Sequence, residues 1–133
     1  MSVILERVGF APDYVNYVES LDMQSRLHAE IAARARQNTI LLLEHEPVIT
    51  AGKRTEDHEY PTDRSTPVVK IDRGGKLTWH GPGQLTGYPI LKLPEPLDVV
   101  AYVRLLEEII MNVLAQLGIK GERVEGRSGV WIL

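Results

Sequence analysis

The residues best suited to chemistry lie in one glycine-rich stretch, DRGGKLTWHGPGQLTGYPIL, which runs from Asp72 to Leu91. Gly74–Gly75 can adopt positive φ and let the main chain lie close to a ligand. Arg73 could bind a carboxylate or fix a neighbouring loop. His80 precedes the turn Gly81–Gly83, whose backbone N–H groups could face a carbonyl oxygen. By spacing alone, the stretch is either a binding loop or a structural turn with a hydrogen-bonded histidine.

Several familiar catalytic motifs do not occur in the sequence. The segment GGKLTWHG lacks the GK[ST] ending of a phosphate-binding loop, and His45-Glu46 is not followed by the second histidine of a zincin. HGPG is similar to the oxyanion loop of lipases, but no G-x-S-x-G elbow supplies a nucleophile. The histidines are spaced too irregularly for a metal site, and the charged run Glu56–Glu59 is typical of a solvated surface. We therefore predict no metal site.

Composition limits the function classes. The chain has 133 residues, the size of one domain, with 44% hydrophobic and 25% charged residues, as is ordinary for globular proteins. A net charge of −3 argues against a general nucleic-acid binder, and the lack of cysteine excludes disulfides and thiolate chemistry from these residues. Glu6 and Arg7 interrupt the first apolar run too early for a signal peptide, and runs such as TILLL are too short to span a bilayer. We predict a cytoplasmic protein that binds neither membrane nor nucleic acid.

The elements that must position the glycine-rich stretch alternate between strands and helices. Periodicity and breakers predict a first helix that opens at Pro12–Asp13 and runs to Ala35, and a second that Asp98 caps and Gly118 ends. The second helix carries an apolar stripe that we expect to pack against a sheet. The predicted strands are Val3–Val8, Thr39–Glu44, VITAG (48–52), VVKID (68–72), Leu77–Trp79, Leu85–Leu93 and SGVWIL (128–133).

This order of elements predicts an α+β fold, a mixed sheet flanked by helices, in one domain over residues 1–133. The sequence stops inside an apolar strand, at Trp131-Ile132-Leu133. Because domain ends tend to be exposed and polar, we expect the sheet to be incomplete at the C-terminus.

The glycine-rich stretch resembles the signature of the octanoyltransferases, the lipoyl(octanoyl) transferases of protein lipoylation. That signature is RGG, two variable positions, T, an aromatic residue, H-x-P-G-Q and a tyrosine. The segments LLLEHEPVITAGKR, DVVAYVRLLEEIIMNVLAQLGI and GRSGVWI are also similar to the family's flanking segments. Ten signature positions match: Arg73, Gly74, Gly75, Thr78, Trp79, His80, Pro82, Gly83, Gln84 and Tyr88.

The resemblance implies a fold like the catalytic domains of biotin and lipoate ligases. It implies transfer of an octanoyl group from octanoyl acyl carrier protein to a lysine of lipoyl domains, in 2-oxoacid dehydrogenase complexes and the glycine cleavage H protein. No cofactor is implied, because octanoyl-phosphopantetheine arrives on the carrier. The segment implied to line the acyl-substrate pocket comprises Arg73, Gly74, Gly75, Lys76, Leu77, Thr78, Trp79 and His80.

The chain departs from the family pattern at the nucleophile. In the family a cysteine forms the acyl-thioester, and a lysine in a K-I-A-x-I-G segment after the GVW strand lowers the pKa of its thiol. Both family segments would lie beyond Leu133, so we expect no catalytic residue in this chain and expect the 133-residue chain alone to be inactive. Two alternatives remain: a non-catalytic or split-enzyme acyl-binding partner, and an ATP-dependent lipoate or biotin ligase.

Overall fold

The computed structural model describes residues 2–133, which form two compact units. The first unit ends at Lys92 and contains all the strands, and the second comprises Leu93–Leu133. The expectation of one domain over residues 1–133 stays a prediction. No helix among residues 2–133 combines the length and the apolar character that crossing a bilayer requires.

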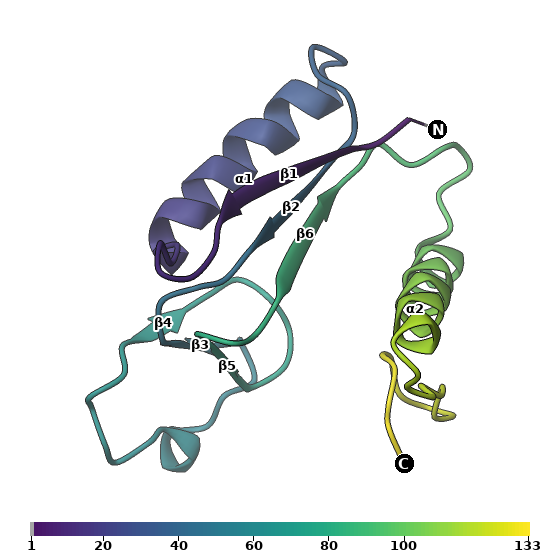
Figure 1. The fold of residues 1–133 in the computed structure, drawn as a ribbon. Coiled ribbons are helices and arrows are strands. Elements are labelled where there is room, and N and C mark those ends of the chain that lie inside the picture. The colour runs from purple at the N-terminus through teal and green to yellow at the C-terminus, as the bar shows by residue number, and fades with distance from the viewer. Residues whose placement is uncertain (1) are drawn as a thin grey trace. The chain divides into compact units, whose positions relative to one another are not determined.

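The first sheet of the N-terminal unit has the order β1-β2-β6, with β2 central. Its strands are β1 (Ile4–Gly9), β2 (Thr39–Leu43) and β6 (Thr86–Ile90). β1 pairs with β2 in parallel and β6 pairs with β2 antiparallel. Helix α1 (Tyr17–Ala32) lies along this sheet (Figure 1), and its Leu27 and Ile31 form the core cluster with the fully buried Leu41 of β2.

The second sheet has the order β4-β3-β5. The chain enters it from the first sheet through the connection between β2 and β3 (Figure 1). Its strands are β3 (Val48–Ala51), β4 (Val68–Lys70) and β5 (Leu77–His80), and a short 3-10 helix, η1 (Asp57–Glu59), lies in the loop between β3 and β4. β3 pairs with β4 in parallel and with β5 antiparallel. Each sheet is therefore mixed, as predicted, although the strands form two sheets of three.

Helix α1 begins later than the sequence predicts. Asn16, not Pro12–Asp13, is the N-cap, and its side chain accepts a hydrogen bond from the backbone N–H of Glu19 at 3.1 Å. The preceding residue, Val15, bridges to His45 and so continues the sheet pairing up to the cap. A proline followed by an aspartate also marks a helix start, so the sequence offers two candidate starts, and the structure uses Asn16.

The C-terminal unit is built on helix α2 (Val99–Gln116), whose predicted ends are confirmed. Asp98 accepts the backbone N–H of Ala101 at 2.9 Å. Gly118 has φ +77°, its N–H bonds to the carbonyl of Ala115, and that of Ile119 bonds to Leu114, the Schellman pattern. The packing of the apolar stripe against a sheet stays a prediction.

The segment after α2 is held by a buried carboxylate. Glu107 is 2% exposed and accepts hydrogen bonds from Gly129 N, Arg104 and Arg123 at 2.7, 2.7 and 3.1 Å, and these lower its pKa. The strand predicted over Ser128–Leu133 is wrong for the described residues, where only an isolated bridge joins Trp131 to Glu122. An apolar run becomes a strand only where a partner backbone lies beside it.

Candidate functional site

Arg73 organises the loop between β4 and β5. Its Nη1 donates to the carbonyls of Gly74 and Lys76 at 2.9 and 3.1 Å, and its Nη2 donates to the hydroxyls of Thr50 and Thr78 at 2.7 and 3.0 Å. The guanidinium thus joins two carbonyls of the loop to two threonine hydroxyls. Of the two roles considered from the sequence, a carboxylate ligand or a loop anchor, the structure has the second.

Gly52, at the end of β3, lets this loop fold back onto the strand. The N–H of Gly52 donates to the carbonyl of Lys76 at 3.1 Å, and that of Arg54 donates to Gly75 at 3.0 Å. A Cβ on Gly52 would lie 2.5 Å from the Gly75 carbonyl oxygen and 2.7 Å from Nη1 of Arg73. Gly75 itself has φ +86°. The sequence predicts Gly52 only as the last residue of the strand VITAG, although a glycine at a strand end is a sign of close backbone approach.

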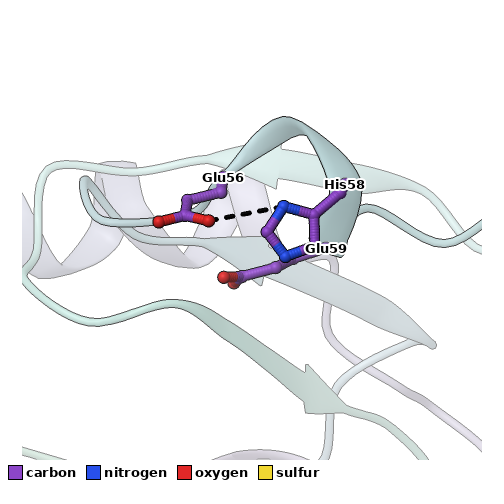
Figure 2. A group of neighbouring side chains, drawn as sticks. All are labelled: Glu56, His58 and Glu59. Carbon is purple, nitrogen blue, oxygen red and sulfur yellow. Dashed lines mark ion pairs between the residues drawn. The ribbon is translucent and has the colours of Figure 1, made fainter.

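Lys76, the fourth residue of the predicted site, points to η1. Its ammonium pairs with the carboxylate of Glu59, and this hydrogen bond raises the pKa of Lys76 and lowers that of Glu59. Figure 2 shows Glu59 beside Glu56 and His58, three side chains whose ligand atoms lie within 4.8 Å of one another. One carboxylate of this group already neutralises Lys76, and Glu56 and His58 are exposed. Glu59 thus holds Lys76, whereas His58 pairs with Glu56, and the absence of a metal site stays a prediction.

Four rings gather where the two sheets of the first unit meet. They come from the start of α1 (Tyr17), the end of β2 (His45), the end of β5 (His80) and β6 (Tyr88). The His80 ring stacks on Tyr17 at 6.1 Å between centroids and 9° between planes, and His45 lies 5.2 to 5.8 Å from the other three rings. His80 is thereby placed against a wall of neighbouring rings.

The fully buried His45 has both ring nitrogens engaged. Nδ1 lies 2.9 Å from the carbonyl of Val15, so it must donate, and Nε2 therefore accepts from the hydroxyl of Tyr88 at 2.7 Å. Burial lowers the pKa of His45, and burial reinforced by Tyr17 raises the pKa of Tyr88 to about 12. Burial also raises the pKa of Tyr17, against the opposing effect of the Arg73 charge. These three side chains are uncharged at neutral pH.

The HGPG turn is tied down from two sides. Within the turn, Nδ1 of His80 lies 2.6 Å from Oε1 of Gln84. From β2, the carboxylate of Glu44 accepts the N–H of Gly83 at 2.8 Å and that of Ala11 at 2.9 Å, and these bonds lower the pKa of Glu44. One carboxylate after β2 therefore joins the β1–α1 loop to the turn that carries His80.

The structure brings together only part of the predicted segment. Arg73 and Thr78 form one hydrogen-bonded unit, and His80 joins the ring cluster. Lys76 turns to Glu59, while the ring of Trp79 is 46% exposed and covers Gly81, where a Cβ would lie 2.3 Å from it. The predicted binding role of each residue stays a prediction.

Other residues of the site were missed from the sequence. Glu44 and His45 directly follow the buried strand Thr39–Leu43, and Tyr17 opens the first helix. A polar pair at the end of a buried strand was the available signal for the first two. Tyr88 was noted only as a signature match.

Comparisons with known proteins show the family of this chain. Residues 16–133 match the family model described as the lipoyl protein ligase A/B catalytic domain. An octanoyltransferase from Leifsonia xyli subsp. xyli is 61% identical over 127 residues, 96% of this chain and 56% of that protein. An octanoyltransferase from Streptomyces coelicolor is 59% identical over 127 residues, 96% of this chain and 48% of that protein. The chain thus spans about half the length of these relatives.

Solved structures share the fold. A putative lipoate protein ligase from T. acidophilum has a TM-score of 0.67 at 16% identity, covering 99% of this chain and 55% of that chain. A lipoate-protein ligase A bound with ATP has a TM-score of 0.59 at 17% identity, covering 92% of this chain and 49% of that chain. These likenesses confirm the predicted lipoate-ligase-like α+β fold, and the relatives confirm the resemblance to octanoyltransferases. The chain belongs to the lipoyl protein ligase A/B catalytic domain family.

Proposed function

We propose that this chain is the part of an octanoyltransferase that binds the acyl substrate. The enzyme moves an octanoyl group from octanoyl acyl carrier protein to a lysine of a lipoyl domain. The observation that carries the proposal is the 61% identity to an octanoyltransferase across almost the whole chain. The RGGKLTWH signature in this sequence supports it. The reaction uses no cofactor, since the acyl group arrives already activated as a thioester.

In this proposal the acyl-binding wall is Arg73–His80. The main chain around Gly75 lies flat against β3, because Gly52 offers no side chain there. The guanidinium of Arg73 is hydrogen-bonded within the loop and to Thr50. The rings beside His80 include Tyr17 and His45, which are uncharged. A wall of backbone and neutral rings suits an apolar chain, since burying a free charge beside it would be costly.

The covalent steps need a nucleophile that these residues do not supply, since the chain has no cysteine. In the first step a thiolate attacks the carrier thioester, a new S–C bond forms, and the carrier thiolate leaves. In the second step the lysine amine attacks the enzyme thioester, and the amine proton is lost as the thiolate is regenerated. The role of these residues is to hold the octanoyl chain during both exchanges.

The test compares the 133-residue chain with the product of the gene read past the Leu133 codon. Each is incubated with octanoyl acyl carrier protein and a lipoyl domain, and octanoylation of the domain is measured by mass spectrometry. Transfer by the gene product supports the proposal. Its absence, with octanoate-dependent ATP–pyrophosphate exchange present, would favour a ligase. Transfer that appears only after a second chain is added would favour a split enzyme.

A variant separates the binding site from the fold. His80→Ala in the gene product should slow transfer more than it lowers the melting temperature. The matched control is His28→Ala, because His28 is an exposed histidine of α1. If His80→Ala lowers only the melting temperature and turnover stays normal, His80 is a structural residue of the turn.

A further inference from the structure

The side-chain amide of Gln84 has a defined orientation. Its Nε2 lies 3.2 Å from the carbonyl oxygen of Trp79, an atom that can only accept, so Nε2 must donate there. Oε1 then faces two groups that can donate: Nδ1 of His80 at 2.6 Å and the hydroxyl of Thr86 at 3.4 Å. The neighbours of Gln84 therefore make its Oε1 an acceptor toward His80.

This orientation decides which nitrogen of His80 carries the proton. Since Oε1 of Gln84 accepts, Nδ1 of His80 must be the N–H donor, and in the uncharged ring Nε2 carries the lone pair. Within residues 2–133, Nε2 of His80 makes no hydrogen bond, whereas both nitrogens of His45 are engaged. His80 thus keeps a free acceptor, while its Nδ1 is held by the turn.

The turn that carries Gln84 is itself held in place. The N–H of Gln84 bonds to the carbonyl of Gly81 at 3.1 Å, and Gly83, with φ +87°, donates its N–H to Glu44. The ring of His80 is stacked on Tyr17. Gln84 and His80 therefore form a pre-arranged pair rather than two surface side chains that meet by chance.

We propose that Gln84 is a positioning residue that fixes His80 as the Nδ1–H tautomer and so presents Nε2 as an acceptor to an N–H group of the substrate. The inference rests on the proposed function for the identity of that substrate. Two parts of the reaction offer such an N–H group: the amides of the phosphopantetheine arm and the amine of the incoming lysine. The pairing of Gln84 with His80 stands on the geometry alone.

The tautomer is measured directly in the complete gene product with ¹⁵N-labelled histidine, by long-range ¹H–¹⁵N correlation NMR. We expect the wild type to show the Nδ1–H form of His80, and Gln84→Met to lose it. Gln84→Glu keeps an acceptor at this place and should keep Nδ1 protonated. Thr86→Val removes only the second donor to the same oxygen and serves as the matched control, with the tautomer unchanged. A wild type that shows the Nε2–H form, or a Gln84→Met variant that keeps Nδ1–H, would overturn the proposal.

Kinetics then identify the substrate group. We expect Gln84→Met to reduce kcat/KM about tenfold, the effect of losing roughly one hydrogen bond. A rise in KM for octanoyl acyl carrier protein assigns the contact to the phosphopantetheine arm, and a rise for the lipoyl domain assigns it to the lysine. Unchanged kinetics with an altered tautomer would refute the substrate contact. A wild type without transferase activity would refute the proposed function, while the NMR result would still decide the role of Gln84.

Discussion

The hydrogen bond between Tyr88 and His45 gives a prediction that can be worked from the structure. Tyr88→Phe leaves the ring in place and removes only the hydroxyl that donates to Nε2 of His45 at 2.7 Å. His45 is 0% exposed and its Nδ1 is already bonded to the carbonyl of Val15. Among residues 2–133, the hydroxyl of Tyr88 is the hydrogen-bond partner of Nε2. A buried acceptor left unpaired costs about 1–3 kcal/mol. We expect the free energy of unfolding to fall by that amount.

A double-mutant cycle isolates this bond from other effects. His45→Leu removes the acceptor of the bond. The double variant with Tyr88→Phe lacks both the donor and the acceptor, so it contains no Nε2 without a partner. The double variant should therefore lose less than the sum of the single losses, by about 1 kcal/mol. Tyr14→Phe is the matched control, because Tyr14 is another half-buried tyrosine of the first unit and the described residues give its hydroxyl no hydrogen bond. That control should change stability by less than about 0.5 kcal/mol.

Urea unfolding followed by tryptophan fluorescence provides the assay. Trp79 lies in the first unit and Trp131 in the second, so a Trp131→Phe background reports on the unit that contains the site. With an m-value of about 2 kcal/mol/M, a loss of about 2 kcal/mol moves the midpoint by about 1 M. A shift no larger than that of the Tyr14 control, or a coupling energy of zero, would refute the reasoning.

Three further predictions concern the same unit and use the same unfolding assay. Gly52→Ala places a Cβ 2.5 Å from the Gly75 carbonyl and should cost about 1–3 kcal/mol, whereas Gly74→Ala, with open space around its Cβ, should be nearly neutral. Arg73→Lys keeps the charge but cannot serve four acceptors at once, so it should lower the midpoint; an unchanged midpoint would contradict the anchoring role. Burial lowers the pKa of His45 from 6.5, so as the pH falls His45 is protonated in the unfolded chain before it is protonated in the folded one. Stability should therefore fall by up to about 1.4 kcal/mol per pH unit below about pH 6.5, until the pKa of the folded state is reached. His45→Gln should remove this part of the slope, and an identical pH profile would exclude His45 as its source.

The parts of the fold that could be predicted are those whose signals are local. Helix α2 has a capping aspartate at Asp98, a continuous apolar stripe and a glycine at Gly118, and the structure confirms both ends. The start of α1 lies at Asn16 rather than at the predicted Pro12–Asp13, although Asn16 followed by Glu19 is itself a local capping signal. The strand predicted after residue 127 failed for a different reason, since strand formation depends on a distant partner.

In the site too, contiguous features could be predicted and features that depend on distant residues could not. The signature from Arg73 to Tyr88 could be recognised because it is contiguous, but its ring neighbours Tyr17 and His45 come from separate elements, and no spacing in the sequence brings them to His80. The sequence therefore identifies the loop. The pairing of His80 with Gln84 and the close approach of Gly52 to the carbonyl of Gly75 are visible only in the structure.

The anchoring role of Arg73 can be related to the two glycines that follow it in the sequence. A loop with two adjacent glycines has no side chains there to fix its path, so hydrogen bonds to its backbone must hold it in one conformation. Of the side chains in the stretch, a guanidinium alone offers enough donors in one plane to serve several of them, and Arg73 serves the carbonyls of Gly74 and Lys76 together with two hydroxyls. Of the two cations that flank the diglycine, Arg73 is hydrogen-bonded within the loop and Lys76 pairs with Glu59. Under the proposed function, an acyl chain bound along Arg73–His80 would therefore meet backbone and neutral rings rather than an unpaired charge.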